Sequence, residues 1–136
     1  MKKEAEEKKA KPETRVIQSS QDGSKLKAIT LRIPIAYLEI LDTECELLYV
    51  KKRSMFLSML LRWKRKELQL VRPETAPDYH FSDEKLTEMV AWTWYVQPAD
   101  FPLIEADRVR MGLSTPSMWV TQLVNYWIGK PFGFQE

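Results

Sequence analysis

The chain has very little of the residues that build metal centres and covalent cross-links. Its 136 residues include one cysteine, Cys45, and one histidine, His80. A single cysteine excludes an internal disulfide framework and any zinc site made of several cysteines of this chain. A single histidine excludes a histidine-rich metal centre in the same way. We therefore expect no metal and no other cofactor.

Long apolar runs are also missing. No stretch of 18 apolar residues occurs, so the sequence predicts no membrane span. The residues after Met1 are charged and show no apolar signal region, so we expect a cytoplasmic protein that does not contact a membrane. Hydrophobic residues still make up 44% of the chain. That share is sufficient for a packed core and excludes a chain that is disordered throughout.

The sequence also lacks recognisable sets of catalytic residues. The sequence contains no nucleophile–base set, no phosphate-binding loop and no carboxylate pair at catalytic spacing. His80 has no partner at a useful spacing, and Cys45 falls in an apolar helical stripe. The sequence thus predicts a protein that is not an enzyme.

Charge is distributed unevenly, although the formal net charge is only +2. Residues 25–72 contain 11 Lys and Arg against 5 Asp and Glu, a net charge of +6, while residues 73–136 contain 4 against 9, a net charge of −5. A basic half joined to an acidic half indicates that one face meets a polyanion such as nucleic acid. The alternative is a chance imbalance on solvated surfaces.

The sequence repeats itself. A shift that places Ala28 on Ala91 aligns 28–63 with 91–126 without a gap, and we call residues equivalent when this shift superimposes them. Six equivalent pairs are identical: Ala28/Ala91, Thr30/Thr93, Ala36/Ala99, Ser54/Ser117, Met55/Met118 and Leu60/Leu123. Apolar positions also stay in step, both where they alternate and where they recur at helical spacing. This pattern predicts a duplicated unit of one strand and two helices. In the first copy the expected strand is 25–33, ended by Pro34, and the expected helices are 35–48 and 54–68.

One such unit cannot bury its apolar faces alone, but two units can if their strands pair antiparallel over the helices. We therefore expect a mainly α fold with a two-stranded antiparallel β-ribbon. The segments follow as a disordered charged tail over 1–24, a first repeat over 25–68, a linker over 69–88, a second repeat over 89–129 and a C-terminal tail over 130–136. Within the linker, Ser82 is placed to cap a short helical turn.

The stretch Ile29-Thr30-Leu31-Arg32-Ile33-Pro34, followed by two predicted helices, resembles the ribbon-helix-helix DNA-binding proteins of the Arc and MetJ type. The second repeat resembles them in Gly112-Leu113-Ser114-Thr115-Pro116-Ser117, a turn between helices in which a serine would be the N-cap. In that family two chains normally form the ribbon. The resemblance implies a tandem ribbon-helix-helix pseudo-dimer in one chain, which would be a monomer in solution.

Further stretches resemble the accessory proteins of T-DNA processing from agrobacterial virulence region C. They are Leu103-Ile104-Glu105-Ala106, Met111-Gly112-Leu113 and the segment from Tyr49 to Leu61. This resemblance implies a bacterial accessory factor that acts beside a relaxase in conjugal or T-DNA-type transfer. A transcriptional repressor that uses the same ribbon is the alternative. A protein-interaction module without DNA binding is the second alternative.

Double-stranded DNA would be read by the outward face of the ribbon. Strict alternation assigns six base-reading residues to that face: Ala28, Thr30, Arg32, Ala91, Thr93 and Tyr95. The alternative is that threonine and tyrosine are simply good strand formers. The family resemblance assigns phosphate binding to the turn before each second helix, with Lys51, Lys52, Arg53, Ser54, Ser114, Thr115 and Ser117.

Two other groups are ambiguous in sequence. The five tryptophans could stack on single-stranded bases, but most fall in the core-facing register, which favours a place in the core. The basic cluster Arg62, Lys64, Arg65 and Lys66 is expected to be a solvated helix end, because basic residues suit a helix C-terminus.

Overall fold

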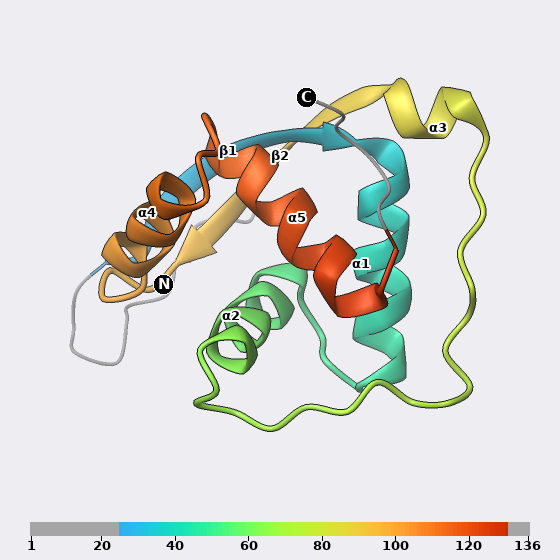
Figure 1. The fold of residues 1–136 in the computed structure, drawn as a ribbon, viewed down its shortest axis with the longest axis horizontal. Helices are drawn as coiled ribbons and strands as arrows, with labels where there is room; N and C mark the ends of the chain where they lie inside the picture. Colours follow the sequence, from blue (N-terminus) through green and yellow to red (C-terminus); the bar gives the residue numbers. More distant parts are fainter. Residues whose placement is uncertain (1–24, 131–136) are drawn as a thin grey trace, which may run out of the picture.

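The computed structural model describes residues 25–130 (Figure 1). In chain order the elements are β1 (Lys27–Pro34), α1 (Ile35–Leu47), α2 (Arg53–Lys64), α3 (Asp83–Thr87), β2 (Met89–Val96), α4 (Phe101–Arg110) and α5 (Pro116–Ile128). The mainly α class with one two-stranded antiparallel sheet is confirmed. The predicted disordered tail over 1–24 and all but the first residue of the C-terminal tail lie outside the described residues.

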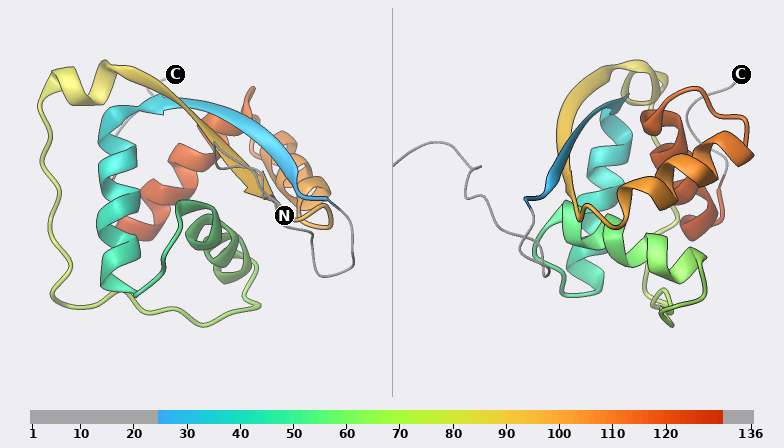
Figure 2. Two further views of the ribbon diagram at one scale, coloured as in Figure 1. Left: turned by 180° about the vertical axis from the view of Figure 1, so that it is seen from behind. Right: turned by 90° about the vertical axis from the view of Figure 1, so that its left-hand side faces the viewer.

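The two strands form a ribbon with one apolar and one open face. In β1, residues Ile29, Leu31 and Ile33 are buried, and the residues between them are exposed. The four longer helices lie on the apolar side of the ribbon and leave its other side uncovered (Figures 1 and 2). The alternation in the sequence therefore predicts correctly which face is inward. Pro34 ends β1 and directly precedes α1, as expected of a residue without a backbone N–H.

The core joins the inward strand residues to side chains from α1, α2, α4 and α5. Three of the five tryptophans, Trp94, Trp119 and Trp127, are buried in it, and Trp63 and Trp92 pack against it partly buried. The core interpretation of the tryptophans is confirmed, because none of the five is an exposed platform for single strands. None of the helices within residues 25–130 is long and apolar enough to cross a membrane.

Two helix ends differ notably from the sequence expectation, while the end of α1 and the start of α2 differ by one residue. The second helix ends at Lys64 rather than at residue 68, because Lys66 takes a left-handed conformation (φ 64°) that no α-helix continues through. The N-cap of α5 is Thr115, whose hydroxyl accepts a hydrogen bond from Met118 N–H at 3.1 Å. The prediction of a serine N-cap at this turn is therefore wrong. At the short helix α3, Ser82 does cap the turn as expected, accepting from Lys85 N–H.

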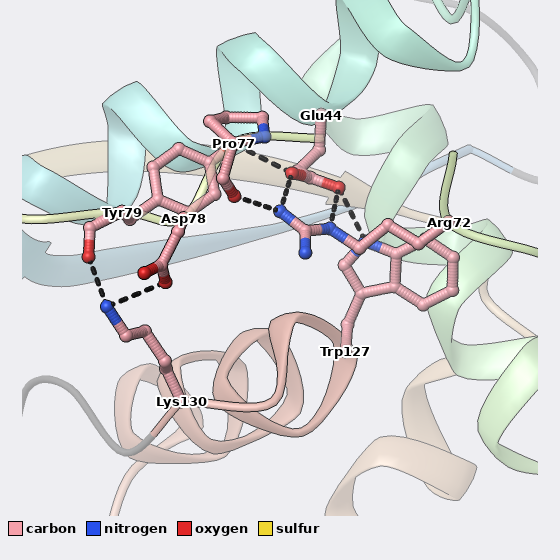
Figure 3. A network of polar contacts seen from close by, with 7 residues as sticks. All are labelled: Glu44, Arg72, Pro77, Asp78, Tyr79, Trp127 and Lys130. Carbon is pink, nitrogen blue, oxygen red and sulfur yellow. Dashed lines mark hydrogen bonds and ion pairs between the residues drawn. The ribbon is translucent and has the colours of Figure 1, made fainter. Parts of the chain in front are cut away.

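The predicted linker over 69–88, which we call the strap, contacts both halves through a few of its residues. Its Tyr79 is buried, and its Arg72 donates two hydrogen bonds to Glu44 of α1 at 2.9 and 2.7 Å. The Tyr79 hydroxyl and the Trp127 indole N–H of α5 also donate to this carboxylate, at 2.6 and 2.8 Å (Figure 3). One buried carboxylate thus ties α1, the strap and α5 together.

The partners of Glu44 decide its ionisation. Burial by itself would raise the pKa of Glu44, but hydrogen bonds from Arg72, Tyr79 and Trp127 outweigh burial and hold the pKa below its usual value. At the end of α5, Lys130 contacts the strap as well, through the Tyr79 carbonyl and the Asp78 carboxylate (Figure 3). The strap is therefore fixed at both α1 and α5.

Polar contacts between the two halves recur at equivalent positions. The Tyr37 hydroxyl of α1 donates to Asn125 Oδ1 of α5 at 2.6 Å. The residue equivalent to Tyr37 is Asp100, and the residue equivalent to Asn125 is Arg62. Arg62 donates two hydrogen bonds of 3.0 Å to Asp100. The contact that crosses from the first half to the second is thus matched by one that crosses back.

A second pair of contacts follows the same rule. Trp127 of α5 donates to Glu44 of α1, and the same shift leads to Lys64 of α2 and Asp107 of α4, which form an ion pair. The expected solvated end of α2 is therefore wrong for Lys64, which is partly buried in a contact with the other half. Arg62 is likewise paired across the halves, and only the last two members of that basic cluster are exposed.

Candidate nucleic-acid interface

All six predicted base-reading residues lie on the open face of the ribbon. The strand register pairs Thr30 with Thr93 at the centre of this face. The remaining pairs are Arg32 with Ala91 and Ala28 with Tyr95. Directly paired residues of an antiparallel ribbon project to the same side, so the pairing brings the six together.

Size and exposure vary across this face in a regular way. Ala28, Thr30, Arg32 and Ala91 are exposed, while Thr93 and Tyr95 are partly buried. The two large side chains, Arg32 and Tyr95, occupy opposite ends of the ribbon, and each stands across from an alanine. Because alanine is small, a ligand can reach Arg32 and Tyr95 from the side of the opposite strand.

Arg32 is the one cation in this set. Within the described residues its guanidinium has no acidic or other hydrogen-bonding partner, and only its backbone N–H is engaged. An exposed arginine that no carboxylate neutralises retains all five of its donors for a ligand. Its geometry suits a pair of acceptors, such as guanine O6 and N7 or two phosphate oxygens.

Two serines that the family resemblance assigns to phosphate hold the ribbon in place. The Ser117 hydroxyl accepts from Arg32 N–H at 2.8 Å, and the Ser54 hydroxyl accepts from Tyr95 N–H at 3.2 Å. These bonds satisfy backbone donors on the outer edges of the two strands, which the ribbon itself leaves unpaired. Each hydroxyl still has its own proton to donate. A phosphate contact is compatible with this structural role.

The turn before α2 places two lysines at the surface. Lys51 and Lys52 are exposed and form no ion pair within the described part of the chain. Arg53 differs from them, because its guanidinium donates two hydrogen bonds to Asp42, at 2.8 and 2.9 Å, and lies 5.5 Å from the Trp92 ring centre. The hydrogen bonds to Asp42 raise the pKa of Arg53. Two of the three predicted basic contacts are thus available to a ligand, and the third is already neutralised.

An open groove of about 450 Å³ connects this turn to the ribbon. Its lining joins residues of α1, the turn and β2: Asp42, Cys45, Glu46, Val50, Lys51, Lys52, Arg53, Ser54, Trp92, Thr93 and Tyr95. The two lysines and two base-reading residues therefore border one continuous surface. Sequence reasoning missed Asp42 as part of this site, because its position on a polar helix face carries no signal of pairing with Arg53.

The turn before α5 is equivalent in position to the turn before α2, but its side chains are chemically different. Ser114 and Thr115 are exposed, and both are engaged with Met118, through its sulfur and its N–H. No lysine or arginine occupies positions 113–117. The residue equivalent to Cys45 is Arg108, which donates to the Leu113 carbonyl at 2.8 Å and pairs with Glu105. This second turn offers hydroxyls but no unpaired cation among the residues that the structure describes.

Other chemistry at this surface is limited. Burial raises the pKa of Cys45 to about 11, so its thiol stays protonated at neutral pH and is a poor nucleophile. Residues 25–130 contain no group of three or more His, Cys, Asp or Glu side chains that could hold a metal ion. The arrangement is suited to binding an extended ligand across the ribbon.

Comparisons of the chain with protein-family models, with curated proteins and with solved structures give no match.

Proposed function

We propose that this protein binds double-stranded DNA by placing the open face of the β1–β2 ribbon in the major groove. The observation that carries the proposal is the ribbon face itself, which gathers six side chains and where the Arg32 guanidinium has no partner among the described residues. A two-stranded ribbon has the width of the major groove, where every base pair presents a distinct pattern of donors and acceptors.

Each residue on this face has a role in reading. Arg32 would donate two hydrogen bonds to guanine O6 and N7. Thr30 and Thr93, paired at the centre, would bond to a base and touch a thymine methyl group. Tyr95 departs from the small polar residues usual at this place in the family that the chain resembles, and it would reach a base edge or a sugar. Ala28 and Ala91 permit close approach.

The proposal includes a tandem ribbon-helix-helix pseudo-dimer in one chain. The order strand–helix–helix occurs twice, as β1-α1-α2 and β2-α4-α5. The strand register is unchanged when each residue is exchanged for its equivalent, because Thr30 pairs with Thr93 and Arg32 with Ala91 while Ala28 pairs with Tyr95. The hydrogen bonds that Ser54 and Ser117 accept from the strands, and the contacts between the halves, also join equivalent residues. These correspondences support an approximate two-fold axis through the ribbon.

Phosphate binding would be unequal in the two halves. Lys51 and Lys52 line the groove and form no ion pair within residues 25–130, whereas Ser114 and Thr115 offer neutral hydroxyls at the equivalent turn. Only a cation releases counterions when it meets a phosphate. The target site should therefore be asymmetric rather than palindromic, with tighter backbone contact under the first half.

The process we propose is DNA transfer. The resemblance of stretches in both halves to virulence-region accessory proteins favours a factor that prepares DNA for a relaxase in the bacterial cytoplasm. In this role the chain contributes recognition and no catalysis of its own. A transcriptional repressor would use the same ribbon, and the two roles differ in which gene lies beside the recognised site.

Selection of bound sites from random duplexes tests the proposal. We expect enrichment of one short asymmetric sequence that contains at least one guanine under Arg32. An Arg32→Ala variant should then lose the preference for that guanine while it still binds duplex. Recovery of no enriched sequence would count against specific reading.

Salt dependence separates DNA binding from a protein-interaction module. Binding through Lys51 and Lys52 should weaken as salt rises, since each neutralised phosphate contributes roughly 0.9 to the slope of log K against log salt. A chain that binds no duplex even at low salt would leave only the protein-interaction alternative.

A further inference from the structure

Tyr49 is the most exposed large hydrophobic residue within the described part of the chain. Its side chain is 94% exposed, and among residues 25–130 it has no hydrogen-bonding, ionic or ring partner. Its backbone has φ 57°, in the left-handed region that tyrosine rarely adopts. The fold therefore accepts a backbone cost at Tyr49 and receives no packing from its ring.

The equivalent residue in the second half shows what the turn itself requires. That residue is Gly112, which has φ 74° and follows α4 with the same backbone hydrogen-bond pattern. Glycine takes this conformation without a steric penalty. A tyrosine at position 49 is therefore not explained by the turn, and its ring needs a role outside the fold.

Two lysines close to Tyr49 in the chain favour an anionic partner. The groove beside them is also lined by Glu46 and by Asp42, and Arg53 neutralises Asp42. The next residues along the chain include Lys51 and Lys52, which no acid neutralises within the described residues. Val50, Lys51 and Lys52 line the groove that also contains Thr93 and Tyr95 of the ribbon face. A DNA duplex on the ribbon would have its backbone pass beside this turn.

We propose that Tyr49 is a backbone contact for that duplex, with its ring packed on a deoxyribose and its hydroxyl donating to a phosphate oxygen. This inference rests on the proposed function. It adds a contact that the second half cannot make, because Gly112 has no side chain there. Tyr49 would position the duplex without reading its sequence.

The test compares Tyr49→Gly, Tyr49→Phe and the wild type on a duplex with the selected site and on a duplex of shuffled sequence. Tyr49→Gly should weaken both by about tenfold, because it removes the ring and a hydrogen bond to a charged acceptor. Tyr49→Phe should have a smaller effect, since it keeps the ring. The salt dependence should not change, because tyrosine releases no counterion.

A matched control is Tyr126→Ala, which removes an exposed tyrosine at the end of α5 away from the ribbon and should leave affinity unchanged. The melting temperature of Tyr49→Gly should equal or exceed that of the wild type, because glycine adopts the left-handed backbone conformation at position 49 without a steric penalty. Wild-type affinity for Tyr49→Gly, or a marked fall in its melting temperature, would overturn this inference alone. An effect confined to the selected site would overturn the backbone assignment. Absence of duplex binding by the wild type would overturn the proposed function as well.

Discussion

The turns 48–54 and 111–117 have equivalent backbone hydrogen bonds but differ in nearly every exposed side chain. Both close with the same hydrogen bonds, such as Val50 N–H to the Cys45 carbonyl and Leu113 N–H to the Arg108 carbonyl, which join equivalent residues. Both carry one serine that holds the opposite strand. The first turn then adds lysines that form no ion pair in the described part of the chain, and the second adds hydroxyls that bond to Met118 of α5.

The difference teaches which features serve the fold and which are available to a ligand. Ser54 and Ser117 are identical because each anchors a strand of the ribbon. Lys51 and Lys52 have no basic counterpart in the second turn, and they form no ion pair among the residues that the structure describes. A single chain with two unequal halves can recognise an asymmetric ligand, which a homodimer with identical turns cannot match as directly.

The largest expected effect comes from the two carboxylates that join the halves. Glu44→Gln should lower the free energy of unfolding by about 3 kcal/mol, because it breaks a buried ion pair and leaves Arg72 without its anion. Asp107→Asn, at the equivalent and less buried position, should cost about 2 kcal/mol by the same physical argument. Urea denaturation measures both. If Glu44→Gln costs no more than Asp107→Asn, the contacts of Glu44 are not the stronger of the two junctions.

Acid should destabilise the fold through the same groups. Burial raises the pKa of Asp107, but hydrogen bonds from Lys64, Trp119 and Arg110 outweigh it and bring the pKa down to about 2. A carboxylate with a lowered pKa in the fold stabilises it above the unfolded pKa, near 4, and this contribution disappears as pH falls towards 2. We expect the free energy of unfolding to fall by about 2 kcal/mol between about pH 5 and 2. Melting curves of Asp107→Asn should depend less on pH in that range, and an identical dependence would contradict the assignment.

Neutralising Lys51 and Lys52 together should lower affinity for all duplexes roughly tenfold or more and reduce the salt slope by roughly 0.9 for each phosphate that is no longer neutralised. Arg53 is left intact in this variant, because its removal would leave Asp42 unpaired. The control is Ser114→Ala, which should change affinity little and the slope not at all. Titrations across a salt series decide between them. An unchanged slope for the double variant would take the first turn out of the interface.

Arg32→Ala should cost specificity more than general affinity. A bidentate arginine–guanine contact supplies about 1–3 kcal/mol of discrimination between bases. Tyr95→Ala, at the position equivalent to Arg32 in the other half, should relax a different part of the site. Competition between the selected duplex and single-base variants measures each effect. Equal weakening of selected and shuffled duplexes by Arg32→Ala would make it a phosphate contact.

The last prediction is that protein concentration has no effect on the melting temperature. One chain supplies both strands of the ribbon, so folding needs no second chain, and the melting temperature should not depend on protein concentration. Thermal melts over a wide concentration range provide the measurement. A midpoint that rises steadily with concentration would show that the two halves do not complete each other within one chain.

Alternation and repeat spacing are sufficient to predict the strands, the longer helices and the open face of the ribbon. Period-two alternation alone assigns Ala28, Thr30 and Arg32 outward, because side chains of a half-buried strand must alternate. The same patterns place the end of the second helix too late, since the left-handed Lys66 has no glycine or asparagine to signal it. Local patterns could not indicate that Leu68 lies outside the core.

Pairings between distant segments are beyond the sequence pattern. Nothing local indicates that Arg53 will be held by Asp42, or that Lys64 will meet Asp107 across the halves. The role of Glu44 is hidden for the same reason, because its partners come from the strap and from α5. Charged side chains are expected to be solvated by default, and their burial depends on which elements meet in space. The internal repeat is the one sequence signal that relates the Glu44–Trp127 contact to the Asp107–Lys64 contact.

The antiparallel pairing of β1 with β2 has a consequence for the order of events during synthesis. The strand partner of Lys27 is Val96, so about 70 residues must follow before the ribbon can close, which takes roughly 3–14 s at about 5–20 residues per second. During this interval the edge of β1 that will pair with β2 is unpaired. Such an unpaired edge invites association with other nascent chains, and charged residues on the strand oppose it. Lys27 and Arg32 meet that need, so the arginine proposed to read DNA would also protect the growing chain before it can fold.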